Sequence, residues 1–141
     1  MTSWEGGTVT AVPRILLAED RQDMLQAINL ALGNEFSVIG AVRDGRDAVE
    51  LTNILHPDVL VLDISMPVVN GIEAAYCLKN LGSQARIIFL SIYSDQEFVE
   101  VALSTGAVGY VVKTSITTDL VPAIWAAMEG KVFISPSMHQ Q

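Results

Sequence analysis

Four short apolar runs of this 141-residue chain each lead into residues that can do chemistry. In chain order these residues are Glu19, Asp20, Asp63, Ser91 and Lys113. The run before Asp63, VLVL, has no polar alternation, which is typical of a strand that is buried on both faces. Acidic groups that gather at such strand ends repel one another, so a cluster of them needs positive charge nearby.

A divalent cation is the natural source of that positive charge. The predicted cluster offers carboxylate oxygens, with no histidine or cysteine beside them, and such a donor set suits a hard ion. A site with few carboxylates and room for waters and a phosphate suits Mg²⁺ better than Ca²⁺. We therefore expect Glu19 and Asp20 to hold Mg²⁺, with Asp63 and the backbone carbonyl of Ser65 as further ligands.

A carboxylate beside Mg²⁺, a hydroxyl and an amine together can carry out phosphoryl transfer. Asp63 is the expected nucleophile, because its strand delivers it to the mouth of the cluster. Lys113 is expected to neutralise charge on the phosphoryl group, and the hydroxyl of Ser91 is expected to bind it.

The elements that must position these side chains are strands alternating with helices. The strands are predicted at 14–19, 35–42, 58–63, 85–92 and 107–113, and the helices at 23–32, 48–55, 74–81, 94–104 and 118–129. Parallel strands need crossover connections, and right-handed crossovers place helices on both faces of the sheet. The fold class is therefore α/β, with the ligand site at the carboxyl ends of the strands.

Local patterns refine several of these helices. The stretch from Ser94 to Glu97 resembles a capping box that opens the fourth helix, and Gly130 is expected to cap the end of the fifth. Cys77 falls on the apolar stripe of the third helix, which predicts a core position. Trp125 lies off the inward stripe of the last helix, so we expect it to be half exposed and available to a dimer surface.

Composition limits the function. Half of the residues are hydrophobic, enough for one compact soluble domain at 13–135, preceded by a loose lead at 1–12 and followed by a linker or tail at 136–141. The net charge of −8 disfavours direct contact with nucleic acids or anionic membranes. With a single cysteine and no apolar run of membrane-spanning length, the sequence predicts a cytoplasmic protein.

Four segments together resemble the receiver domain of bacterial two-component response regulators. They are AED (18–20), LDISMPVVNG (62–71), FLSIY (89–93) and GYVVK (109–113). Within that family, ILLAED near the start and EGKVFISPS near the end are similar to the NarL/FixJ (LuxR-type) regulators. The resemblance covers residues 13–135.

The resemblance implies a flavodoxin-like (βα)5 fold with strand order 2-1-3-4-5. It implies that Asp63 accepts a phosphoryl group from a sensor histidine kinase with Mg²⁺ and later loses it by hydrolysis. Ser91 and Tyr110 would act as switch residues, changing the surface of the fourth helix, fifth strand and fifth helix. Transcription would be regulated through a DNA-binding domain outside this chain, and phosphorylation could produce a homodimer.

The sequence departs from the family at three positions. Glu19 replaces the usual first aspartate, which keeps the charge on a longer arm. Thr114 follows Lys113 where many receivers have proline, which puts the usual cis peptide at that joint in doubt. Ile92 is bulkier than the small residue often found beside the hydroxyl, so it narrows access to Asp63.

Three other functions remain as alternatives. Phosphatases of the haloacid dehalogenase class use a similar set of groups, but they need an acid two positions after the nucleophile, where this chain has Ser65. A flavin-binding module would need a phosphate-cradling loop after the first strand, and Glu19-Asp20-Arg21 would repel the phosphate. A receiver-like scaffold that is not phosphorylated is the third. We expect a phosphoacceptor rather than an enzyme that turns over substrates.

Overall fold

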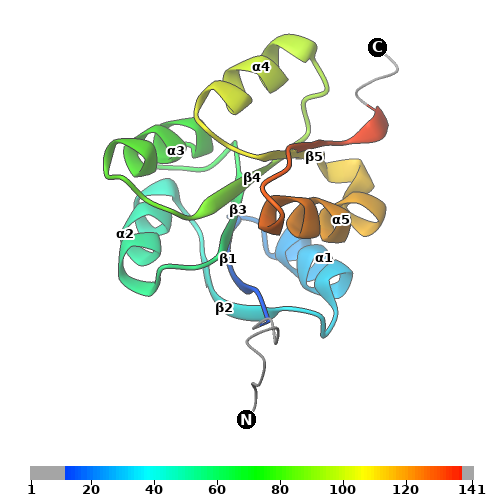
Figure 1. Cartoon of the computed structure of the whole chain (residues 1–141), viewed down its shortest axis with the longest axis horizontal. Helices are drawn as coiled ribbons and strands as arrows, with labels where there is room; N and C mark the ends of the chain where they lie inside the picture. The colour runs from blue at the N-terminus through cyan, green and yellow to red at the C-terminus, as the bar shows by residue number, and fades with distance from the viewer. Residues whose placement is uncertain (1–11, 138–141) are drawn as a thin grey trace.

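The computed structural model describes residues 12–137, which form a single parallel sheet between two layers of helices (Figure 1). The strands are β1 (Arg14–Ala18), β2 (Ser37–Val42), β3 (Val59–Asp63), β4 (Arg86–Ser91), β5 (Gly109–Val112) and β6 (Phe133–Ile134). The helices are α1 (Gln22–Leu32), α2 (Gly45–Leu55), α3 (Gly71–Asn80), α4 (Gln96–Ser104), the short 3₁₀ helix η2 (Lys113–Ser115) and α5 (Ile116–Met128).

The strand order is β2-β1-β3-β4-β5-β6, which confirms the predicted order 2-1-3-4-5 and adds one strand. The register places Ala18 beside Leu62, Asp63 beside Leu90, and Ser91 beside Val112. Because all the strands are parallel, these end residues lie along one edge of the sheet, as the sequence predicted.

Both faces of the sheet are buried. Helices α1 and α5 cover one face, and α2, α3 and α4 cover the other (Figure 1). Strand β3 is therefore buried along its whole length, which explains why its sequence lacks polar alternation. Its side chains alternate between the two cores, with Leu60 and Leu62 facing α2 and α3, and Val59 and Val61 facing α1 and α5.

Helix capping differs from the prediction. The capping box in the structure opens α3, where Asn70 accepts from the backbone N–H of Glu73 and the Glu73 side chain accepts from the N–H of Asn70. The box predicted at Ser94 was wrong, because the N-cap of α4 is Asp95, one residue after Ser94, and its side chain makes no capping bond. The loop before α4 is instead held by bonds from Ser91 and Tyr110, described below.

Two other expectations are corrected. Cys77 is exposed rather than in the core, because Ala74, Ala75 and Leu78 form the inward stripe of α3. Helix α5 begins at Ile116, two residues before the predicted start, and contains Pro122 in its second turn. Trp125 is half exposed, as predicted, with its ring beside Phe36.

The sixth strand extends the sheet beyond β5. Phe133 and Ile134 pair with Gly109 and Tyr110 in parallel, and the backbone N–H of Ser135 donates to the carbonyl of Tyr110. The buried hydroxyl of Ser135 accepts from the N–H of Val112, so the segment after α5 is tied to β5 by main-chain and side-chain bonds.

Some predictions fall outside the described residues. The loose lead predicted at 1–12 lies outside them apart from Val12, and the tail predicted at 136–141 lies outside them from residue 138. Across residues 12–137, the helices are too short or too polar for any of them to traverse a lipid bilayer.

Candidate functional site

Asp63 is held at the end of β3 by close backbone packing. A side chain on Gly71 would bring its Cβ to 2.3 Å from the carbonyl oxygen of Asp63, so only glycine fits at the start of α3. The N–H of Gly71 also donates to the carbonyl of Ile64, 2.8 Å away. The backbone N–H of Ser65 donates to Oδ1 of Asp63 at 3.1 Å, which fixes the orientation of the carboxylate.

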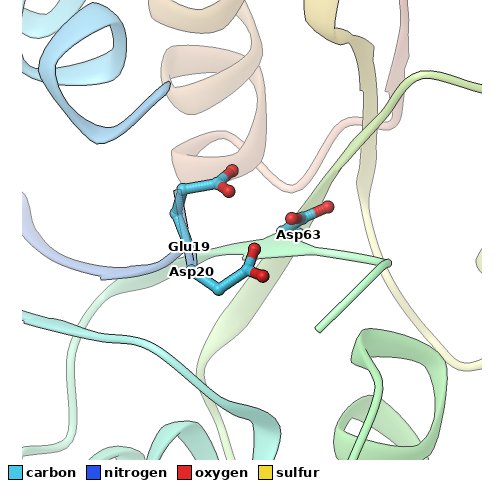
Figure 2. Close-up of side chains that lie close together, drawn as sticks. All are labelled: Glu19, Asp20 and Asp63. Carbon is cyan, nitrogen blue, oxygen red and sulfur yellow. The ribbon is translucent and has the colours of Figure 1, made fainter. Parts of the chain in front are cut away.

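Three carboxylates meet at this edge of the sheet, as Figure 2 shows for Glu19 and Asp20 after β1 and for Asp63 on β3. One oxygen from each lies within 4.8 Å of the others. Glu19 and Asp63 are buried, and Asp20 is partly exposed. The predicted convergence of Glu19, Asp20 and Asp63 is therefore present in the fold.

Lys113 provides the positive charge within the cluster. Its Nζ lies 3.2 Å from Oε1 of Glu19 and 3.1 Å from Oδ2 of Asp63. The Lys113 side chain is only 9% exposed, so both ion pairs are shielded from water. The Lys113–Thr114 peptide is not cis, since the described residues contain no cis peptide bond.

The charge balance of the cluster is incomplete without a further cation. Burial, followed by the nearby negative charge of Asp63, raises the pKa of Glu19 from 4.5 to about 7, although Lys113 opposes the rise. Oε2 of Glu19 accepts from the N–H of Arg21, but the buried Oε1 accepts no hydrogen bond from the described residues and has only its ion pair with Lys113.

A pH dependence of stability follows from the raised pKa of Glu19. Folded protein binds more protons than unfolded protein between about pH 4.5 and pH 7, so Glu19 should favour folding below this range and disfavour it above. Without divalent metal, the free energy of unfolding of the wild type relative to Glu19→Gln should fall from about pH 5 to about pH 8. Urea unfolding in the presence of a chelator would measure this difference in the free energy of unfolding at each pH. Parallel pH profiles for the two proteins would contradict the raised pKa of Glu19.

A cavity of about 260 Å³ opens over the cluster, lined by Asp20, Arg21, Asp63, Ser65, Ile92 and Lys113. The oxygen-rich donor set and the small separation of the carboxylates fit a hard divalent cation. So does the buried Oε1 of Glu19, whose one contact in the described residues is its ion pair with Lys113. Ile92 lines the cavity, and 67% of its surface is exposed. This is the side chain that the sequence predicts to narrow access to Asp63.

Ser91 and Tyr110, the two predicted switch residues, are not among the described residues that line this cavity. The buried hydroxyl of Ser91 accepts from the N–H of Tyr93 at 2.9 Å. The hydroxyl of the fully buried Tyr110 donates to the carbonyl of Tyr93 at 2.7 Å. Both side chains therefore hold the same residue of the β4–α4 loop, and the ring of Tyr93 stacks on Phe98 of α4.

Sequence reasoning did not single out Arg21, Arg43 or Gly71 as contributors to the site. Arg21 lines the cavity, and Arg43 donates to the backbone carbonyl of Asp20 at 2.9 Å. Arg21 directly follows Glu19 and Asp20, so its position in the sequence could have indicated that it lines the cavity. Arg43 is distant from Asp20 in the sequence, so no local pattern could have indicated their contact.

Comparison with known families fits this geometry. A family model described as the response regulator receiver domain matches residues 15–125, which is most of the chain. The chain belongs to this family. Residues 15–125 run from β1 into α5 and so include every member of the acidic cluster and Lys113.

Individual relatives place the receiver more closely. It is 35% identical over 127 residues to the transcriptional regulatory protein DegU of Brevibacillus brevis, covering 89% of this chain and 54% of DegU. It superposes with a TM-score of 0.86 on a LuxR-family two-component response regulator from Aurantimonas sp. SI85-9A1, at 29% identity, covering 92% of this chain and 94% of the other.

A third likeness is to the isolated REC domain of RcsB from Salmonella enterica serovar Typhimurium, a structure obtained in the presence of the phosphomimetic BeF3−. The TM-score is 0.83 at 25% identity, covering 92% of this chain and 98% of that domain. The assignment to the NarL/FixJ (LuxR-type) response regulators is confirmed. The receiver spans about half the length of DegU.

Proposed function

We propose that this receiver is a phosphorylation switch in which Asp63 accepts a phosphoryl group from a sensor histidine kinase. The observation that carries the proposal is the pairing of Asp63 with Lys113 at 3.1 Å on the wall of a cavity that Asp20 also lines. One oxygen each of Glu19, Asp20 and Asp63 lies within 4.8 Å of the others, close enough to share a cation. A carboxylate, an amine and an oxygen-rich metal site are the parts that phosphoryl transfer requires.

The transfer itself needs no oxidant and no further reactant. An oxygen of Asp63 forms a bond to phosphorus while the bond from phosphorus to the donor breaks, and the donor keeps the electron pair. From phosphohistidine the leaving imidazole nitrogen holds that pair, and from an acyl phosphate a carboxylate leaves. Water later attacks phosphorus, restores the Asp63 carboxylate and releases inorganic phosphate with a proton.

Each residue of the site has a defined part in this proposal. The N–H of Ser65 orients Asp63, and Lys113 offsets negative charge on the transferred group. Glu19, Asp20 and Asp63 would hold Mg²⁺, with the backbone carbonyl of Ser65 as a further ligand. The ion, when bound, supplies positive charge to the phosphoryl oxygens.

The switch proposal rests on the bonds of Tyr93. If the Ser91 hydroxyl turns to the phosphoryl group, it gives up the N–H of Tyr93, and of these two bonds only the one from Tyr110 still holds the loop. One new dianion at Asp63 would thereby change the β4–α4 loop and, through the Tyr93–Phe98 stack, the surface of α4. The exposed surface of α4, β5 and α5 would carry the signal.

The wider context belongs to the same proposal. The likeness to DegU, a transcriptional regulatory protein, supports an output in transcription through a DNA-binding domain outside this chain rather than direct DNA contact by the receiver. The half-exposed Trp125 on α5 would contribute to a homodimer formed on phosphorylation. We place the receiver in the cytoplasm, without membrane contact, and not among enzymes that turn over substrates.

The experiment that tests the proposed function is incubation with acetyl phosphate, followed by intact-mass measurement. With Mg²⁺ we expect one phosphoryl group per chain. With a chelator in place of Mg²⁺ we expect a reaction slower by roughly a hundredfold, about what the loss of one charge-stabilising contact costs. An adduct that forms equally well in chelator would contradict the metal assignment.

The same time course separates the alternatives. A long-lived single adduct supports a signalling switch. Continuous release of many equivalents of phosphate without an adduct would instead support a phosphatase, and an unmodified protein would support a scaffold.

A further inference from the structure

Two cations line the cavity over Asp63, and they differ in what they already bind. Nζ of Lys113 is shared between Glu19 and Asp63 and is shielded from water. The guanidinium of Arg21 has no bond to the carboxylate cluster. Instead, its Nε and Nη2 donate to Oδ1 and Oδ2 of Asp23, in the first turn of α1, at 3.2 and 3.1 Å.

The Arg21–Asp23 pair is exposed to solvent, and Arg21 also lines the cavity. Both side chains are largely exposed, with 67% and 71% of their surfaces accessible. An exposed ion pair of this kind contributes little to stability, so the guanidinium can exchange partners at small cost. Two bonds to one carboxylate also hold the planar group in a fixed orientation beside the cavity.

A phosphoryl donor that approaches Asp63 has to cross a strongly acidic entrance. The donor carries negative charge on its phosphoryl oxygens, and Asp20 and Asp63 on the cavity wall repel it. A guanidinium presents a fork of N–H donors that matches phosphate oxygens, and it stays charged at all relevant pH values. Of the two cations that line the cavity, Arg21 is the exposed one, whereas the Lys113 side chain is only 9% exposed.

We propose that Arg21 binds the phosphoryl donor at the cavity over Asp63. Until the donor arrives, the guanidinium of Arg21 stays bound to Asp23. This inference rests on the proposed function and names a donor-binding residue for it. The ligand class is a phosphoryl group on a small acyl phosphate or on a phosphohistidine. Arg21 contributes to binding of the donor, and Asp63 and Lys113 contribute to the transfer step.

The test measures the initial rate of adduct formation against the concentration of acetyl phosphate, with saturating Mg²⁺. Arg21→Gln should raise the half-saturating concentration roughly three- to tenfold and leave the maximal rate unchanged. Arg21→Lys keeps the charge but loses the fork of N–H donors. Its half-saturating concentration should lie between those of the wild type and Arg21→Gln. The matched control is Arg46→Gln, the same charge change at an exposed residue of α2 that does not line the cavity.

A double-mutant cycle tests the part of Asp23. Asp23→Asn frees the guanidinium and should lower the half-saturating concentration, but the same change should have no effect in the Arg21→Gln background. Circular dichroism of each variant checks that α1 still forms.

The outcomes separate this inference from the proposed function. Equal half-saturating concentrations for Arg21→Gln and Arg46→Gln would overturn the role of Arg21 while Asp63 remains the phosphoacceptor. A lower maximal rate with an unchanged half-saturating concentration would also overturn it, because the residue would then act on the transfer and not on capture. A wild-type protein that takes up no phosphoryl group would overturn both.

Discussion

Replacement of Asp63 by asparagine should abolish the phosphoryl adduct that acetyl phosphate forms on the wild-type protein. The amide keeps the shape of the side chain but is neutral, and its oxygen is a far weaker nucleophile than a carboxylate oxygen. The N–H of Ser65 can still donate to the amide oxygen, so the loop after β3 should keep its conformation. Intact mass at matched times would show the loss.

A second readout of Asp63→Asn does not depend on phosphorylation. The charge of Asp63 helps to raise the pKa of Glu19, so its removal should lower that pKa and flatten the pH dependence of stability. The matched control is Asp95→Asn, at the exposed N-cap of α4, where no side-chain capping bond is lost. An adduct that persists on Asp63→Asn would show that another residue accepts the group.

Replacement of Lys113 by methionine should cause the largest loss of stability among the site variants. Methionine fills nearly the same space, but it leaves Glu19 and Asp63 without the cation that lies 3.2 and 3.1 Å away. Removal of one partner from a buried ion pair costs about 3 kcal/mol or more, because the remaining charge is buried without compensation. Urea unfolding of metal-free protein would measure the loss.

The pH dependence of this loss has a definite sign. Protonation of Glu19 removes one of the two uncompensated charges, so the loss for Lys113→Met should be smaller at about pH 5 than at about pH 8. Lys131→Met is the matched control, because Lys131 pairs with Glu129 at 3.1 Å but both side chains are exposed. A loss for Lys113→Met no larger than that for Lys131→Met would contradict the buried pairing.

Much of the site could be predicted because it depends on strand ends. The apolar run before Asp63 has to be a fully buried strand, and parallel strands bring their carboxyl ends to one edge. Glu19, Asp20 and Lys113 therefore had to lie near Asp63 whatever the details of the helices.

What the sequence could not supply depends on which way single side chains turn. Ser91 lies at the expected strand end, but its hydroxyl accepts from the N–H of Tyr93, a local hydrogen bond that the sequence pattern does not reveal. Cys77 was misplaced because Ala74, Ala75 and Leu78 satisfy the same helical period and pack inward in its place. The short β6 was missed because two residues carry too little pattern to separate a strand from a tail.

The most direct test of the central claim is to locate the phosphoryl group on the chain. After incubation with acetyl phosphate and Mg²⁺, borohydride reduction converts an aspartyl phosphate to homoserine, and peptide sequencing by mass spectrometry finds the converted residue. We predict conversion at position 63 alone, and roughly a hundredfold less conversion at matched early times when Mg²⁺ is removed by a chelator. Conversion at Asp20 or at any other acid, with position 63 unchanged, would contradict the account.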